Sequence, residues 1–203
     1  MKALVAAASV ATLALYATDA AAFGWRECDD VKVVWEGANN LFRNTFSIGN
    51  GGARESAYLN GITRWNAVRG MNDILVNAGT TAGSSITHGN DQSDAAVVPA
   101  SAIGNAAGLT KRFFDSCDIF SDQHIIETDV MVASNQDFTT NPDEATVFLP
   151  ARITFLHEFG HALGLNHFED YNIMRAVGAS PFVGGTGEHA DILPDDAAGG
   201  RFL

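Results

Sequence analysis

The chain has 203 residues, 46% of them hydrophobic, and its 12 basic and 24 acidic residues give a net charge of −12. This length and composition suit a single globular domain with a sizeable core. An acidic surface helps solubility and disfavours nucleic acid and anionic lipid as partners. We therefore expect one monomeric domain and neither a nucleic-acid-binding nor a membrane-surface protein.

The first 22 residues have the pattern of a secretory signal peptide. Lys2 opens a short positive region, residues 3–17 form an apolar run, and residues 20–22 are alanines that offer a cleavage site. The apolar run is too short to span a bilayer comfortably, and an uncleaved anchor is the alternative. We expect a signal peptide at 1–22, a mature domain at 23–203 without a membrane span, and a secreted or periplasmic location.

The first part of the mature domain predicts strands and a helix. Residues 31–37, VKVVWEG, are typical strand formers, and LFRNTFSIG at 41–49 would be the continuation or the hairpin partner of that strand. After the glycine-rich turn signal at 49–52, residues 53–68 predict a helix. The candidates for its core face are Ala57, Ile62, Trp65 and Val68.

Residues 70–110 are harder to interpret, because short apolar runs alternate with Gly, Ser, Thr and Asn, and only one strand near 73–77 is predicted. His88 lies in THGNDQSD, where several oxygen ligands gather. The spacing lacks the ordered carboxylates and the terminal glutamate of an EF-hand. A Ca²⁺ loop and a plain surface loop both stay open.

A further strand is predicted at 125–132, IIETDVMV, where Glu127 and Asp129 could support a loop or a cation. We expect His124 and His189 to be surface or hydrogen-bonded histidines rather than metal ligands. Cys28 and Cys117 belong to a chain bound for an oxidising compartment, which favours a disulfide between them. Closing a loop of roughly ninety residues could stabilise the fold by about 4 kcal/mol, and two free thiols are an alternative.

The segment HEFGHALGLNH at 157–167 places three of the six histidines within eleven residues. On a helix, His157 and His161 lie one turn apart on the same face and direct two imidazoles at one point. Gly164 could end this helix in a left-handed conformation, so that His167 approaches from another direction. Three protein ligands with a fourth position left to water are typical of a catalytic Zn²⁺ site.

Glu158 directly follows the first histidine, and in HExxH sites this glutamate is the general base for the bound water, not a ligand. A turn with a helix cap is predicted at 141–144, and Pro150 makes the helix that carries the motif begin near Ala151. The packing groups expected around the metal-facing side of that helix are Thr154, Phe155, Phe159 and Leu163.

The pattern HExxHxxGxxH, followed by Met174 in YNIMRA, resembles the metzincin clan of zinc endopeptidases. HEFGHALGLNH is close to the matrixin form, including that of bacterial-type enzymes. The resemblance implies an α/β (α+β) fold with a twisted mixed sheet, two long helices and a small C-terminal subdomain after Gly164. It also implies that Met174 forms a tight turn beneath the metal and that a substrate peptide pairs with the edge strand of the sheet.

Three further segments are similar to matrixin elements. RWNAV at 64–68 resembles the end of the first helix, residues 125–132 resemble the strand before the active-site helix, and PDDAAGGRFL at 194–203 resembles the start of the closing helix. Ala176 stands where astacin-like and serralysin-like enzymes carry a tyrosine, which disfavours those branches. The interval between 125–132 and His157 is short, so we do not expect a second structural metal.

The resemblance adds a third reading of Cys28, as a latency thiol that occupies the fourth zinc position, although the matrixin PRCGxPD pattern is missing. The sequence thus predicts a zinc metalloendopeptidase with protein or peptide substrates. Two alternatives are a zinc-binding pseudoenzyme or adhesion module without turnover, and a zinc exopeptidase that acts on short peptides.

Overall fold

The structure is a computed structural model of the chain. It describes residues 27–28, 31–35, 40–45, 47–49, 51–68, 75–81, 83, 85–115, 123–138, 151–167, 173–174, 192 and 197. Several predictions lie outside these ranges: the signal peptide at 1–22, the turn at 141–144, Cys117, Ala176, His189 and, apart from Ala197, the segment 194–203.

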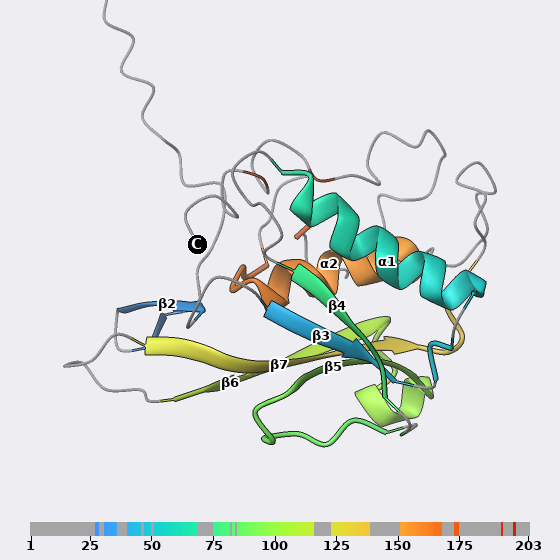
Figure 1. The fold of residues 1–203 in the computed structure, drawn as a ribbon, viewed down its shortest axis with the longest axis horizontal. Coiled ribbons are helices and arrows are strands. Elements are labelled where there is room, and N and C mark those ends of the chain that lie inside the picture. Colours follow the sequence, from blue (N-terminus) through green and yellow to red (C-terminus); the bar gives the residue numbers. More distant parts are fainter. Residues whose placement is uncertain are drawn as a thin grey trace, which may run out of the picture.

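Seven strands of the described residues form one mixed sheet, with the order β1-β2-β7-β5-β3-β4 and with β6 also paired to β7 (Figure 1). Strands β2, β7, β5, β3 and β4 run parallel to one another, whereas β1 pairs with β2 and β6 pairs with β7 in antiparallel orientation. The strands are β1 Glu27–Cys28, β2 Val31–Trp35, β3 Asn40–Asn44, β4 Leu75–Thr80, β5 Ser93–Val98, β6 Gly108–Phe114 and β7 Gln123–Ala133.

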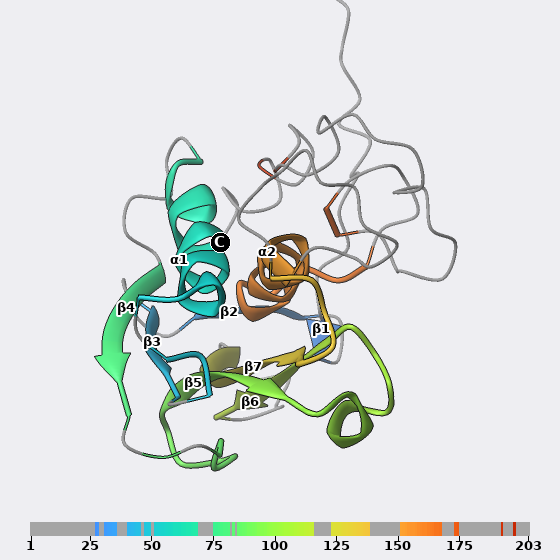
Figure 2. The ribbon, with the colours of Figure 1, turned by 90° about the vertical axis from the view of Figure 1, so that its right-hand side faces the viewer.

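Two helices, α1 (Ala53–Asn66) and α2 (Ala151–Ala162), cover the same face of the sheet (Figure 2). They pack closely because Gly61 has no side chain at the crossing: a Cβ atom there would lie 2.7 Å from Cδ2 of Phe159. The indole Nε1 of Trp65 donates a hydrogen bond of 2.8 Å to the carbonyl oxygen of Leu156. Burial and this bond together fix α2 against α1.

The long strand β7 separates two layers, because successive side chains point to opposite faces. Val130 and Val132 belong to the main core beneath the helices, whereas Met131 and Ala133 pack with Ile103, which lies in the short 3₁₀ helix η1 (Ala100–Ile103), on the other side. The strand is buried on both faces over these residues. Strand β7 therefore lies between the main core on the helical side of the sheet and the smaller cluster on the other side.

Most of the predicted elements are confirmed, with shifted ends. The strand predicted at 31–37 is β2, the helix predicted at 53–68 is α1, the strand near 73–77 is β4, and residues 125–132 lie in β7. Helix α2 begins at Ala151, as expected after Pro150. All four residues assigned to the core face of α1 are buried: Ala57, Ile62, Trp65 and Val68.

The predicted partner of the segment 41–49 is wrong. Strand β3 neither continues nor pairs with β2; it pairs in parallel with β4 and β5. Parallel neighbours require a crossover connection, which α1 supplies between β3 and β4. The hydrophobic pattern predicts burial, and Phe42 is fully buried, but burial of a side chain does not specify which strand lies beside it.

Candidate functional site

Helix α2 carries most of the candidate site and is almost entirely buried. His157 is 7% exposed and Glu158 is 5% exposed, so both residues are buried. His161 follows one turn later, and the His157 and His161 rings meet edge to face with centroids 4.6 Å apart. The helical repeat therefore brings the first two histidines together, as the i, i+4 spacing predicts.

The turn after α2 brings in the third histidine. Gly164 has φ of 103°, a positive value that favours glycine over any side-chain-bearing residue. Its N–H donates to the carbonyl oxygen of His161 at 3.0 Å, and the N–H of Leu165 donates to that of Gly160 at 3.0 Å. This pair of bonds is the Schellman arrangement of a helix end. The chain reverses there, and His167 returns toward the helix.

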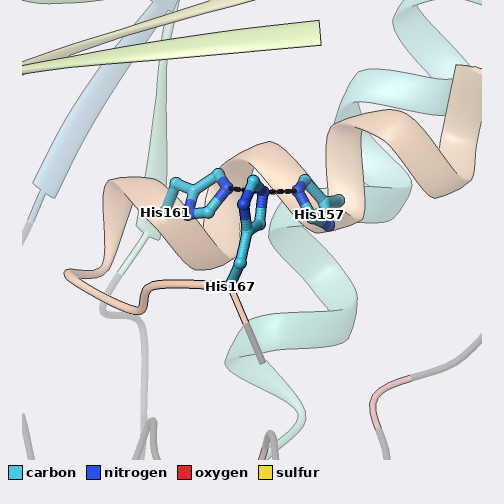
Figure 3. A group of neighbouring side chains, drawn as sticks. All are labelled: His157, His161 and His167. Atoms are coloured by element: carbon cyan, nitrogen blue, oxygen red, sulfur yellow. Dashed lines mark hydrogen bonds between the residues drawn. The ribbon is translucent and has the colours of Figure 1, made fainter. Parts of the chain in front are cut away.

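The three imidazoles converge on one point (Figure 3). The Nε2 atom of His167 lies 3.1 Å from Nε2 of His157 and 3.0 Å from Nε2 of His161. The candidate ligand atoms of all three lie within 4.8 Å of one another, and no other group of this kind is found in the part of the chain that the structure describes. This triad could hold a metal ion.

The opposite ring nitrogens of two histidines are held by backbone carbonyls. Nδ1 of His157 lies 2.6 Å from the carbonyl oxygen of Ile173, and Nδ1 of His161 lies 2.7 Å from that of Leu165. A carbonyl only accepts hydrogen bonds, so Nδ1 carries the proton in both rings. The Nε2 lone pairs are then left to face the common point, as metal ligation requires.

The three histidines are also held in the neutral form. Burial lowers the pKa of His157 to about 4 and that of His161 to about 3, against an ordinary value of 6.5. Burial also lowers the pKa of His167, with a further contribution from the positive charge of Arg112. All three rings are therefore neutral near pH 7, which is the form that binds a metal.

Glu158 directly follows His157 on α2, and its carboxyl group is not among the converging ligand atoms. Burial raises the pKa of Glu158 to about 7, while the hydrogen bond from Thr110 and the positive charge of Arg112 act in the opposite direction. A carboxyl group whose pKa lies near neutrality can accept and release a proton at working pH. The position and the pKa both suit a general base.

Met174 is 1% exposed and lies against α2 at Gly160. The contact depends on Gly160, since a Cβ atom there would lie 2.1 Å from Sδ of Met174 and 2.9 Å from Cζ2 of Trp65. Gly160, the glycine of HEFGH, thus leaves room for Met174 to contact the helix surface. Because Met174 follows Ile173 directly, the same segment supports His157 through the carbonyl and the helix through the thioether.

Sequence reasoning missed the strand that faces Glu158. Oγ1 of Thr110, on β6, lies 2.7 Å from Oε2 of Glu158. On the same strand, Nη2 of Arg112 donates a hydrogen bond of 3.1 Å to Oδ1 of Asn166. No local signal could have found these contacts, because GLTKRFF lacks the strict alternation of a half-buried strand.

The loop around His88, for which a Ca²⁺ loop and a plain surface loop were both open, contacts β7. Glu127 is fully buried and accepts hydrogen bonds from the N–H groups of Gly89 (2.7 Å) and Asn90 (2.6 Å), while Asp129 accepts one from His88. Both carboxylates are thus engaged with donors of the loop. These contacts favour the reading of a plain loop bound to the sheet.

The other candidate residues lie away from the triad. His124 contacts Asp115 at the β6–β7 connection, with Nδ1 3.3 Å from Oδ2, as expected for a hydrogen-bonded surface histidine. Cys28 lies on β1, and Cys117 lies outside the described residues, so the disulfide stays a prediction.

Comparison of the chain with protein-family models and with curated proteins gave no match. In the described part of the chain, no helix is both long enough and apolar enough to cross a membrane. We therefore infer the function from the geometry of the histidine site and from the residues of its motif.

Proposed function

We propose that the protein is an exported zinc-dependent endopeptidase of the metzincin type, with His157, His161 and His167 as the metal ligands and Glu158 as the general base. The observation that carries the proposal is the convergence of three Nε2 atoms beside a buried glutamate. A zinc ion with tetrahedral bonds of about 2.0–2.1 Å separates its nitrogen ligands by about 3.3 Å. The observed separations of 3.0 and 3.1 Å come close to that value.

The choice of zinc follows from the donor set. Three neutral imidazoles and an open fourth position are typical of catalytic zinc, whereas calcium and magnesium prefer oxygen ligands. A zinc ion bound there would lower the pKa of a water molecule and polarise the scissile carbonyl group. Glu158 would take the proton of that water and deliver it to the leaving nitrogen.

An extended peptide is the substrate that the surroundings of the site suit best. Strand β6 pairs with β7 alone among the described strands and therefore presents a second edge for pairing. Its helix-facing residues lie against Glu158, so a peptide added along this edge would pass the histidine site. Leu109 lies on the same strand and is 36% exposed, and no other large hydrophobic side chain of the described residues is classed as exposed. It offers an apolar contact to a bound peptide.

The test combines metal analysis with cleavage of an unfolded protein such as casein, using chain that lacks residues 1–22. We expect one equivalent of zinc per chain and internal cleavage that stops when a chelator is added and resumes when zinc is restored. Glu158→Gln should keep the zinc and lose hydrolysis, because the amide cannot accept the proton. Glu55→Gln, the same change at a distance on α1, serves as the matched control.

The other outcomes separate the alternatives. Zinc without cleavage, even after treatment with a thiol reagent, would favour a pseudoenzyme or adhesion module. Cleavage that begins only after such treatment would favour the latency role of Cys28. Trimming of chain ends without internal fragments would favour an exopeptidase. Near wild-type cleavage by Glu158→Gln would show that the base is assigned wrongly.

A further inference from the structure

Strand β6 faces helix α2 with every second residue. Gly108 lies against Glu158 so closely that a Cβ atom there would be 2.5 Å from Oε1 and 2.7 Å from Cγ of the glutamate. Two residues along, Oγ1 of Thr110 lies 2.7 Å from Oε2 and 2.9 Å from the backbone oxygen of Glu158. The strand thus leaves space for the carboxyl group at one residue and supplies a hydroxyl to it at the next facing residue.

The buried environment makes this contact important for the orientation of Glu158. A glutamate side chain has several rotatable bonds, and holding it in one arrangement costs conformational entropy unless a specific contact selects that arrangement. Thr110 is itself stiff, because its branched Cβ restricts χ1. Its hydroxyl sits on a strand that is paired to β7 along its whole length, so the donor position is fixed by the sheet.

We propose that Thr110 is a positioning residue for Glu158, and that Gly108 completes the arrangement by leaving room for the carboxyl group. The strand whose second edge is proposed to pair with a substrate peptide would then also orient the base that acts on that peptide. The catalytic consequence rests on the proposed function; the Thr110–Glu158 contact itself does not.

A structural role of Thr110 is the competing explanation, because the same hydroxyl reaches the backbone oxygen of α2 and could simply hold β6 to the helix. The conservative variant separates the two. Thr110→Val keeps the shape and removes the hydroxyl, whereas Thr110→Ser keeps the hydroxyl and removes a methyl group. Thr128→Val is a matched control, since Thr128 is a fully buried threonine of β7 whose hydroxyl has no hydrogen-bond partner among the described residues.

The first measurement is the kinetics of peptide hydrolysis by the zinc-loaded variants. We expect Thr110→Val to lower kcat by about tenfold or more with KM and zinc content nearly unchanged, and Thr110→Ser to stay within about threefold of wild type. Thr128→Val should match wild type. An unchanged kcat for Thr110→Val, or an equal loss in the serine and valine variants, would overturn the proposal.

The second measurement needs no activity. Melting temperatures of the zinc-loaded wild type, Thr110→Val, Glu158→Ala and the double variant form a cycle that reports the coupling between the two side chains. We expect the valine substitution to lower the melting temperature much less when Glu158 is already absent. Additive shifts would contradict the contact. If the wild type binds zinc but never hydrolyses peptides, the proposed function fails while this cycle still decides the contact.

Discussion

The carbonyl oxygen of Ile173 lies 2.6 Å from Nδ1 of His157, and the next residue, Met174, packs against the helix that carries this histidine. One short segment therefore fixes the tautomer of a candidate metal ligand and fills the space behind the site. It does so from sixteen residues further along the chain than His157. The metal site and the packing of this segment should consequently fail together.

Replacing Met174 by alanine tests this dependence. Because Met174 is 1% exposed, the substitution would leave a cavity, and we expect a loss of about 2–5 kcal/mol in the free energy of unfolding. Denaturant unfolding of the metal-free protein measures it. Met174→Leu conserves volume and should cost less than about 1.5 kcal/mol. Weaker zinc binding should accompany the alanine variant, as competition with a chelator would show; equal zinc affinity in all three proteins would contradict the link.

Gly160→Ala should reverse the usual effect of this substitution in a helix. An alanine in a helix interior is normally more stable than glycine by about 1 kcal/mol. Here the new Cβ would lie 2.1 Å from Sδ of Met174 and 2.9 Å from an atom of the fully buried Trp65 ring. We expect a lower melting temperature and weaker zinc binding. Gly83→Ala, where the nearest atom would be 3.8 Å away, is the control; a stabilised Gly160→Ala protein would show that Met174 moves aside freely.

The sequence alone predicted much of the site because its information is local. The spacing from His157 to His161 is one helical turn, and a glycine at 164 suits the positive φ of 103° at which α2 ends. The core face of α1 could likewise be read from the spacing of Ala57, Ile62, Trp65 and Val68. Each of these predictions depends on residues only a few positions apart.

The parts that could not be predicted depend on contacts between distant segments. Strand β5, SDAAVV, begins with two polar residues that are nonetheless buried, so its pattern is not that of a half-exposed strand. Arg43 explains part of this, because it pairs with Asp94 at 2.9 Å across β3 and β5. The contacts of Thr110 with Glu158 and of Glu127 with Gly89 are similarly non-local. Which strand neighbours which is decided by the whole sheet.

Acid should destabilise the metal-free protein through His157 and His161. Burial lowers the pKa of His157 from 6.5 to about 4 and that of His161 to about 3, so the unfolded chain takes up protons first. Their contribution is present above pH 6.5 and is lost as the pH falls through about 4 and 3. For His157 this amounts to about 3 kcal/mol. Urea unfolding at pH 7 and pH 4 measures the loss.

The same protonation should release the metal, because only neutral imidazoles bind it. Zinc retained by the protein after dialysis at a series of pH values reports this directly. We expect the protein to retain zinc near pH 7 and to release it in acid. Excess zinc should lower the pH at which the protein unfolds. Zinc that stays bound below pH 3 would mean that the histidines are not the ligands.

Glu158 should act in the opposite direction at higher pH. Burial raises its pKa from 4.5 to about 7, so the folded metal-free protein favours the protonated acid more than the unfolded chain does. The stability from this group is complete below pH 4.5 and is lost as the pH rises through about 7. Burial also raises the pKa of Asp129, to about 6, and that of Asp94, so the pH dependence of the wild type combines the titration of three carboxyl groups.

Comparison with Glu158→Gln isolates the glutamate. The amide does not ionise, so the variant should gain stability relative to wild type as the pH rises from 5 to 8, in the metal-free state. Urea midpoints of both proteins across that range measure the difference. The zinc-loaded proteins provide the contrast, because a nearby cation favours the charged carboxylate and should shrink the difference. A constant difference between the two metal-free proteins at all pH values would mean that the pKa of Glu158 is not raised, and would leave Asp129 and Asp94 as the groups that titrate.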